Sequence, residues 1–163
     1  MSSSASDKVT GISIGDHASR ATFTFPDVHP GEDIDMFVVY DANHDGQFSN
    51  GEIVGSSTAP AGSNESVTLT RPGAGDYQVW VYGFQVSAAD TTTGNTVGVD
   101  VVEGNDLTVT GVPPGPVAAN DPITLHVSYA NATGTGDLKG ELQLGPSVAP
   151  SAVTIPITVT PAP

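Results

Sequence analysis

The sequence of 163 residues has no cysteine and only four basic residues. The absence of cysteine excludes disulfide bonds, thiolate metal sites and cysteine nucleophiles. Four Lys and Arg against eighteen Asp and Glu leave a net charge of −14. This charge argues against nucleic acid and anionic membranes as partners, because both require clustered positive charge. The acidic excess instead favours cation binding and solubility outside the cell.

Long apolar runs and helical periodicity are also missing. No apolar run approaches the length of a membrane span, and no window carries a sustained apolar period of 3.6 residues, so almost no helix is expected. Valine and threonine are abundant, leucine is scarce, and 19 glycines and 13 prolines are scattered along the chain. This composition is typical of short strands joined by tight turns. The sequence therefore predicts an all-β protein.

The distribution of aromatic residues predicts a boundary near Glu103. Nine of the ten aromatic residues precede it, and only Tyr129 follows it. We expect a larger β module at 9–103 and a small immunoglobulin- or fibronectin-III-like β module at 104–160. Residues 1–8 are interpreted as a cloning scar or linker end and residues 161–163 as a tail. Strand patterns are expected at 20–25, 34–40, 66–70, 76–84, 96–102, 106–111, 123–129, 138–144 and 153–160.

Residues 41–52 read D-A-N-H-D-G-Q-F-S-N-G-E and match the twelve-residue calcium-loop pattern. Gly46 stands at the sharp-turn position and Phe48 at the position whose side chain normally points inward. Calcium prefers six to eight hard oxygen ligands, and carboxylates crowded into one turn repel one another without a cation. The predicted ligands are Asp41, Asn43, Asp45, the backbone carbonyl of Gln47, Ser49 and Glu52.

The segments that flank this loop read as strands and not as the helices of an EF-hand. We therefore expect a static structural Ca²⁺ site that bridges a β-hairpin. The alternative is an Asx-rich surface turn that binds nothing. Asp33 and Asp35, with Glu32 beside them, form a second acidic cluster. That cluster is expected to bond to backbone amides, with a second cation as the alternative.

The predicted strand at 76–84 alternates between two apolar faces. Trp80, Tyr82 and Phe84 share one face, and Tyr77 and Val79 lie on the other. We interpret the face with Trp80 and Tyr82 as a buried face of the core. The alternative is an exposed aromatic surface that stacks on sugar rings or proline-rich protein. No catalytic motif is present in the sequence, so no enzymatic activity is expected.

Three stretches of the sequence carry motifs of one known family. Residues 33–41 read D-I-D-M-F-V-V-Y-D, residues 63–69 read S-N-E-S-V-T-L, and residues 72–83 read P-G-A-G-D-Y-Q-V-W-V-Y-G. They resemble the prepeptidase C-terminal-type domain, over about residues 9–103. With a second β module that opens at Asp106, the chain is similar to the C-terminal region of secreted bacterial subtilisin-like serine proteases.

This resemblance implies a jelly-roll-like antiparallel β-sandwich, an extracellular setting and a parent protease domain in cis. It implies calcium near Asp33, Asp35 and the loop that begins at Asp41, and it implies no catalysis, since the subtilisin motifs G-T-S-M-A and H-G-T-H are absent. The expected function is a non-catalytic, calcium-stabilised accessory module that stabilises the parent or engages insoluble protein. The alternative is an extracellular carbohydrate-binding or cell-surface adhesion module that binds polysaccharide.

Overall fold

The structure is a computed structural model that describes residues 6–26, 31–86, 96–104, 106–129, 137–146, 148–149 and 151–160. These residues form β-strands, one short 3₁₀ helix and no α-helix, and every paired strand is antiparallel. The all-β prediction is confirmed. Within these ranges no helix is long and apolar enough to cross a membrane. Contacts divide the chain into two compact units, unit 1 (Met1–Glu103) and unit 2 (Gly104–Pro163).

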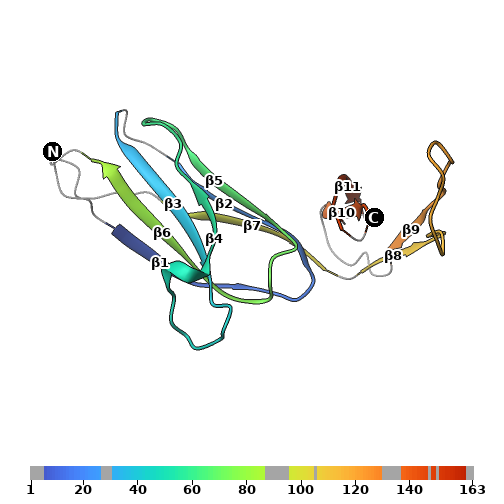
Figure 1. The fold of residues 1–163 in the computed structure, drawn as a ribbon, viewed down its shortest axis with the longest axis horizontal. Coiled ribbons are helices and arrows are strands. Elements are labelled where there is room, and N and C mark those ends of the chain that lie inside the picture. Colours follow the sequence, from blue (N-terminus) through green and yellow to red (C-terminus); the bar gives the residue numbers. More distant parts are fainter. Residues whose placement is uncertain are drawn as a thin grey trace. The chain divides into compact units, whose positions relative to one another are not determined.

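Unit 1 contains a four-stranded sheet in the order β1-β6-β3-β4 (Figure 1). Its strands are β1 (Ser6–Ile14), β6 (Gly75–Gln85), β3 (Asp33–Tyr40) and β4 (Ile53–Ser57). β3 has a paired neighbour on each side, so both of its edges are hydrogen-bonded.

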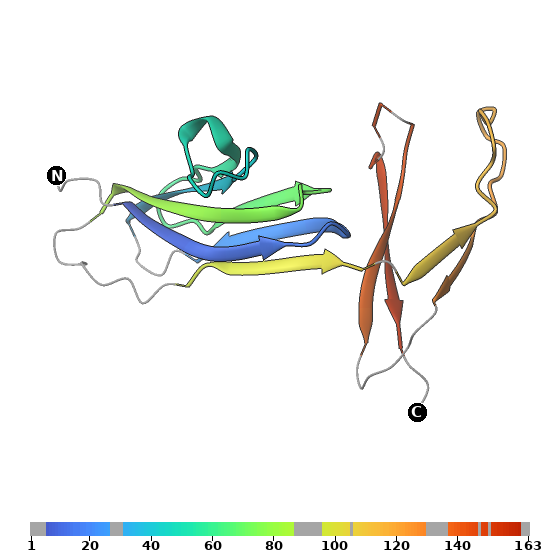
Figure 2. The same cartoon turned by 90° about the horizontal axis from the view of Figure 1, so that it is seen from below.

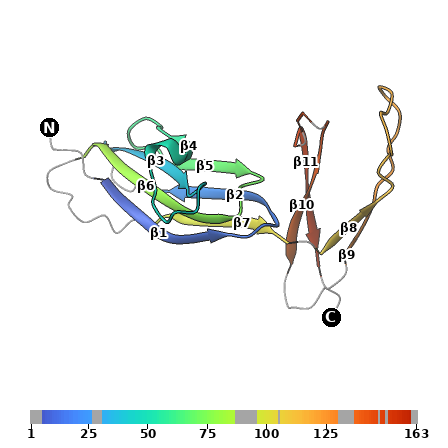
Figure 3. The ribbon, with the colours of Figure 1, turned by 60° about the horizontal axis from the view of Figure 1, so that its bottom comes forward.

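The second sheet of unit 1 has three strands in the order β5-β2-β7 (Figure 3). They are β5 (Glu65–Thr70), β2 (Ala18–Phe25) and β7 (Gly98–Glu103). The closing pair, β2 with β7, joins segments far apart in the sequence, since Ala18 pairs with Glu103.

Buried apolar side chains from both sheets form one core between them. Phe23 of β2 and Tyr77 of β6 are both fully buried, and their ring centroids lie 6.1 Å apart. Burial raises the pKa of Tyr77 to about 12, and its hydroxyl donates to the carbonyl of Gly73 at 2.7 Å. The core consists of Ile14, Ala18, Ala21, Phe23, Phe25, Ile34, Met36, Val38, Val67, Tyr77 and Val79.

β1 corrects the interpretation of the N-terminus. The strand begins at Ser6 and pairs with β6, so that Lys8 lies opposite Trp80. Residues 6–8 therefore belong to the sheet and not to a linker. The alternation of this strand is interrupted by a register shift between Val9 and Ile12, where Gly11 has φ 78°. That shift hides the period-2 pattern on which the sequence prediction relied.

Unit 2 consists of two separate two-stranded pairs in its described residues. β8 (Leu107–Thr110) pairs with β9 (His126–Tyr129), and β10 (Leu138–Leu144) pairs with β11 (Val153–Val159). Each of the nine predicted strand ranges overlaps a strand of the structure.

Candidate functional site

The loop at residues 41–52 starts from a buried carboxylate at the end of β3. Asp41 is 3% exposed, and its N–H donates to the carbonyl of Asp76 on β6 at 3.0 Å. Its carboxylate accepts two N–H bonds from the loop: Asp45 donates to Oδ1 at 3.1 Å and Gly46 to Oδ2 at 2.9 Å. The loop is therefore folded around the side chain of its own first residue.

The middle of the loop is a series of side-chain-to-backbone turns. Asn43 Oδ1 accepts the N–H of Asp45 at 2.9 Å, and Asp45 Oδ1 accepts the N–H of Gln47 at 2.8 Å. Gly46 has φ 74°, a left-handed conformation that glycine adopts without steric cost. The side-chain oxygens of Asp41, Asn43 and Asp45 therefore all accept backbone N–H groups of the loop itself.

The loop ends in the 3₁₀ helix η1 (Asn50–Glu52). The carboxylate oxygen Oε2 of Glu52 accepts both the N–H and the hydroxyl of Ser49 at 2.9 Å, as in a helix capping box. The other oxygen, Oε1, is buried and has no hydrogen-bond partner among the described residues. A buried acceptor without a partner costs about 1–3 kcal/mol, so this oxygen is suited to accept a further ligand.

The donor set of the loop fits a hard cation. All six predicted ligands offer oxygen, which calcium prefers over nitrogen and sulfur. Across the described ranges, no three or more His, Asp or Glu side chains gather into a cluster that could hold a metal ion. The structure therefore does not gather the carboxylates of Asp41, Asp45 and Glu52 into such a cluster. The other predicted donors are the amide of Asn43, the hydroxyl of Ser49 and the backbone carbonyl of Gln47. The fit therefore rests on donor chemistry and on Glu52 Oε1.

The loop also packs on the sheet that carries it. Val39 points to the side of β3 opposite to Met36 and Val38, yet it is fully buried. η1 contacts β3, and Figure 2 shows the loop on the side of the four-stranded sheet that faces away from β7. Phe48, at the inward-pointing loop position, is half-buried. Ordering of the loop is therefore coupled to burial of one end of the sheet's outer face.

Asp33 and Asp35 are half-buried at the start of β3. Burial, followed by the charges of Asp33 and Glu65, raises the pKa of Asp35. Glu65 of β5 is 1% exposed; its Oε2 accepts the N–H of Ala59, and its Oε1 has no partner among the described residues. The expected bond from a carboxylate to a backbone amide is thus made here by Glu65, a residue that the sequence analysis did not select.

The prediction that Trp80 and Tyr82 form a core face is wrong. On β6 it is Tyr77 and Val79 that are buried, whereas Trp80 and Tyr82 are half-buried and Phe84 is 66% exposed. Both faces of this strand are apolar, so the sequence pattern could not distinguish them. The opposite sheet decides which face of β6 is buried, because the three-stranded sheet covers only one face.

Sequence reasoning missed two residues on the face of the four-stranded sheet that carries Trp80. Lys8 Nζ lies 4.5 Å from the centroid of the Trp80 ring, and Phe37 of β3 is directly opposite Trp80. Lys8 was overlooked because residues 1–8 were interpreted as a linker. Phe37 could have been found from the alternation of 33–40, which places it on the same side as Asp33 and Asp35.

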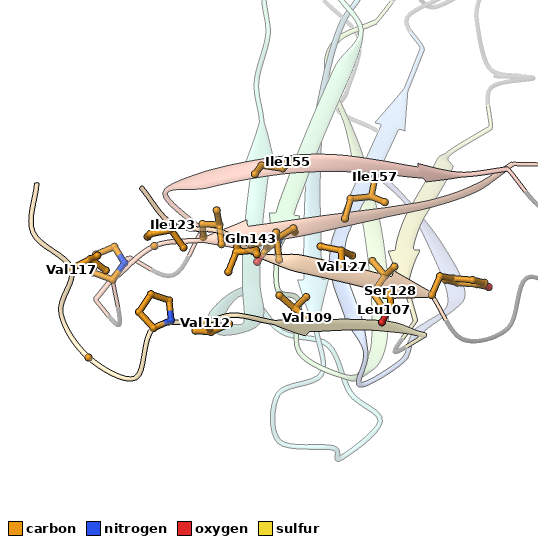
Figure 4. A pocket seen from close by; sticks show the side chains of 18 of the residues that line it. Leu107, Val109, Val112, Val117, Ile123, Val127, Ser128, Gln143, Ile155 and Ile157 are labelled. Atoms are coloured by element: carbon orange, nitrogen blue, oxygen red, sulfur yellow. The ribbon is translucent and has the colours of Figure 1, made fainter. Parts of the chain in front are cut away.

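Unit 2 has an open apolar groove of about 1200 Å³ between its two strand pairs. Figure 4 shows Val109 and Val127 from one pair and Ile155 and Ile157 from the other along this groove. No charged side chain lines it. Among the described residues that line it, there is no nucleophile paired with a base and no acid pair.

No protein-family model matches this chain, and no curated protein is significantly similar to it.

Proposed function

We propose that this chain is a non-catalytic β module whose larger unit is stabilised by a calcium ion in the loop at 41–52. The observation that carries the proposal is Glu52 Oε1, a buried carboxylate oxygen without a partner at the end of a loop folded around Asp41. We further propose that unit 1 is a jelly-roll-like β-sandwich and that unit 2 is an immunoglobulin- or fibronectin-III-like module.

Calcium would be held by the side chains of Asp41, Asn43, Asp45, Ser49 and Glu52 and by the carbonyl of Gln47. The ion would offset the repulsion among three carboxylates within twelve residues, and Glu52 Oε1 would gain its missing partner. Since η1 contacts β3, a bound ion would also hold the loop against the side of β3 on which Val39 lies. The role is therefore structural.

The proposed biological role is that of an accessory module beside a secreted peptidase domain. It is supported by the sequence motifs at 33–41, 63–69 and 72–83, by the charge of −14, and by the lack of a catalytic motif. In this role the module stabilises the parent protein or helps it engage insoluble protein.

A second candidate is an extracellular binding module, and a specific observation favours it. The aromatic side chains of Trp80, Tyr82 and Phe84 lie on the face of the four-stranded sheet that is turned away from the core; Trp80 and Tyr82 are half-buried and Phe84 is exposed. An exposed aromatic face is typical of surfaces that bind sugars or protein segments. The two roles are compatible, because the calcium loop lies at one end of this face.

Thermal unfolding with Ca²⁺, with Mg²⁺ and with chelator tests the calcium proposal. At a Ca²⁺ concentration of about 100 times the dissociation constant, we expect a stabilisation of about 2.7 kcal/mol. The double substitution Asp41→Ala and Asp45→Ala should abolish the calcium effect. The matched control, Asp7→Ala with Asp100→Ala, removes two exposed carboxylates of unit 1 outside the loop and should keep it. An unchanged calcium response in the loop variant would refute the ligand assignment.

A further inference from the structure

The side of the four-stranded sheet that faces away from the three-stranded sheet combines aromatic rings with carboxylates. We call it the outer aromatic face and define it by Lys8, Asp35, Phe37, Trp80, Tyr82 and Phe84. The strand register places these groups next to one another: Trp80 lies between Lys8 and Phe37, and Tyr82 lies opposite Asp35. Residues i, i+2 and i+4 of a strand span about 13 Å, so the rings of β6 form an elongated surface.

A cation already occupies this face. Lys8 Nζ lies 4.5 Å from the centroid of the Trp80 ring, within the range of a cation–π interaction. Trp80 Nε1 donates to Gln78 Oε1 at 2.9 Å, which orients the ring. A sugar needs a free ring face for stacking, and Lys8 covers this one. A cationic side chain of a partner, in contrast, can replace Lys8 in the same position.

The charges around the rings favour the same class of ligand. Asp35 lies beside Tyr82. Burial, followed by the charges of Asp33 and Glu65, raises the pKa of Asp35. Within the described residues, no ion pair is found for Asp33 or Asp35. A positive charge near Tyr82 would therefore relieve repulsion among carboxylates.

We propose that the outer aromatic face binds an extended polypeptide segment with Lys or Arg at alternate positions. Side chains of an extended segment at i and i+2 point the same way with the same spacing as Trp80, Tyr82 and Phe84. Its cations lie against the rings and beside Asp35. This inference names the partner class of the binding module proposed above and does not depend on the calcium loop.

The single tryptophan of the chain is Trp80, so its fluorescence reports directly on this face. We would titrate the whole protein, in Ca²⁺, with an eight-residue peptide alternating Lys and Thr, with the same peptide carrying Gln for Lys, and with a neutral hexasaccharide. The Lys peptide should change the fluorescence and bind at least about tenfold more tightly than the Gln peptide, and its affinity should fall with added salt.

Two substitutions locate the contact. Asp35→Asn and Tyr82→Ala should each weaken binding of the Lys peptide about fivefold, since each removes one contact of modest strength. Asp100→Asn, which removes an exposed carboxylate of β7 in the other sheet, should leave the affinity unchanged. Equal loss in Asp35→Asn and Asp100→Asn, equal binding of both peptides, or tighter binding of the hexasaccharide would each overturn the proposal.

The peptide experiment can fail without affecting the calcium proposal, and the reverse also holds. A calcium-dependent rise in melting temperature without peptide binding would refute the partner class alone. Peptide binding without a calcium effect would refute the metal site alone.

Discussion

The two units are built from similar strands and differ in what those strands bury. The described residues of unit 1 include twelve buried apolar residues, whereas the described residues of unit 2 include no buried residue. Unit 1 holds nine of the ten aromatic residues and two sheets of at least three strands. Unit 2 has two isolated strand pairs, and such pairs are marginally stable by themselves. Large side chains between wide sheets, and not strand content, therefore produce the core.

The largest expected effect comes from matched truncations in the two units. Phe23→Ala removes a fully buried ring from unit 1 and should lower the free energy of unfolding by about 3–5 kcal/mol. Leu142→Ala in unit 2 removes a half-buried side chain and should cost about 1 kcal/mol. Urea unfolding followed by Trp80 fluorescence and by far-UV circular dichroism measures both. Equal losses would show that unit 2 has a core as tight as that of unit 1.

Trp80→Ala tests whether the outer aromatic face of unit 1 is packed as loosely as unit 2. Because Trp80 is only half-buried, we expect a loss of about 1–2 kcal/mol, well below that of a buried aromatic residue. The melting temperature, read by circular dichroism, measures this loss. A decrease as large as that of Phe23→Ala would mean that the outer face is covered in solution.

The smallest effect concerns charge, which the two units share unequally: fourteen of the eighteen acidic residues lie in unit 1. The pKa of Asp35 is raised above its ordinary value of 3.8 by burial, Asp33 and Glu65. Protonated Asp35 therefore favours the folded state, and this stability is lost as the pH rises through the folded pKa. Asp35→Asn should raise the melting temperature at pH 7.

The advantage of Asp35→Asn should vanish below the unfolded pKa, where the wild-type carboxyl is also neutral. Melting curves from pH 3 to pH 8 measure it. Asp137→Asn, an exposed carboxylate of unit 2, serves as the matched control and should show no such pH dependence. An equal gain in melting temperature in the control would show that the Asp33–Asp35 cluster does not cause the effect.

Much of the fold could be predicted because strand alternation and turn residues are local signals. The prediction at 138–144 coincides with β10, and the loop at 41–52 begins at the end of β3. β1 escaped prediction, because the register shift near Gly11 breaks its alternation.

The sidedness of β6 could not be predicted, because it is a property of the assembled sheets. Tyr77 and Trp80 are both large and apolar, and only the position of the three-stranded sheet determines which is covered. The role of Glu65 was likewise hidden, since a carboxylate is rarely expected inside a core. Its place on the same strand face as Val67 was the one available signal.

The pairing of β2 with β7 determines when the three-stranded sheet can be completed during synthesis. Ala18 pairs with Glu103, so the three-stranded sheet is incomplete until nearly all of unit 1 has left the ribosome. Contacts between such distant segments slow folding to milliseconds or seconds, whereas the pairs β8–β9 and β10–β11 join nearer neighbours and form early. The nascent chain thus leaves one edge of β2 unpaired until β7 has been made, and that interval is when chaperones have the most to protect.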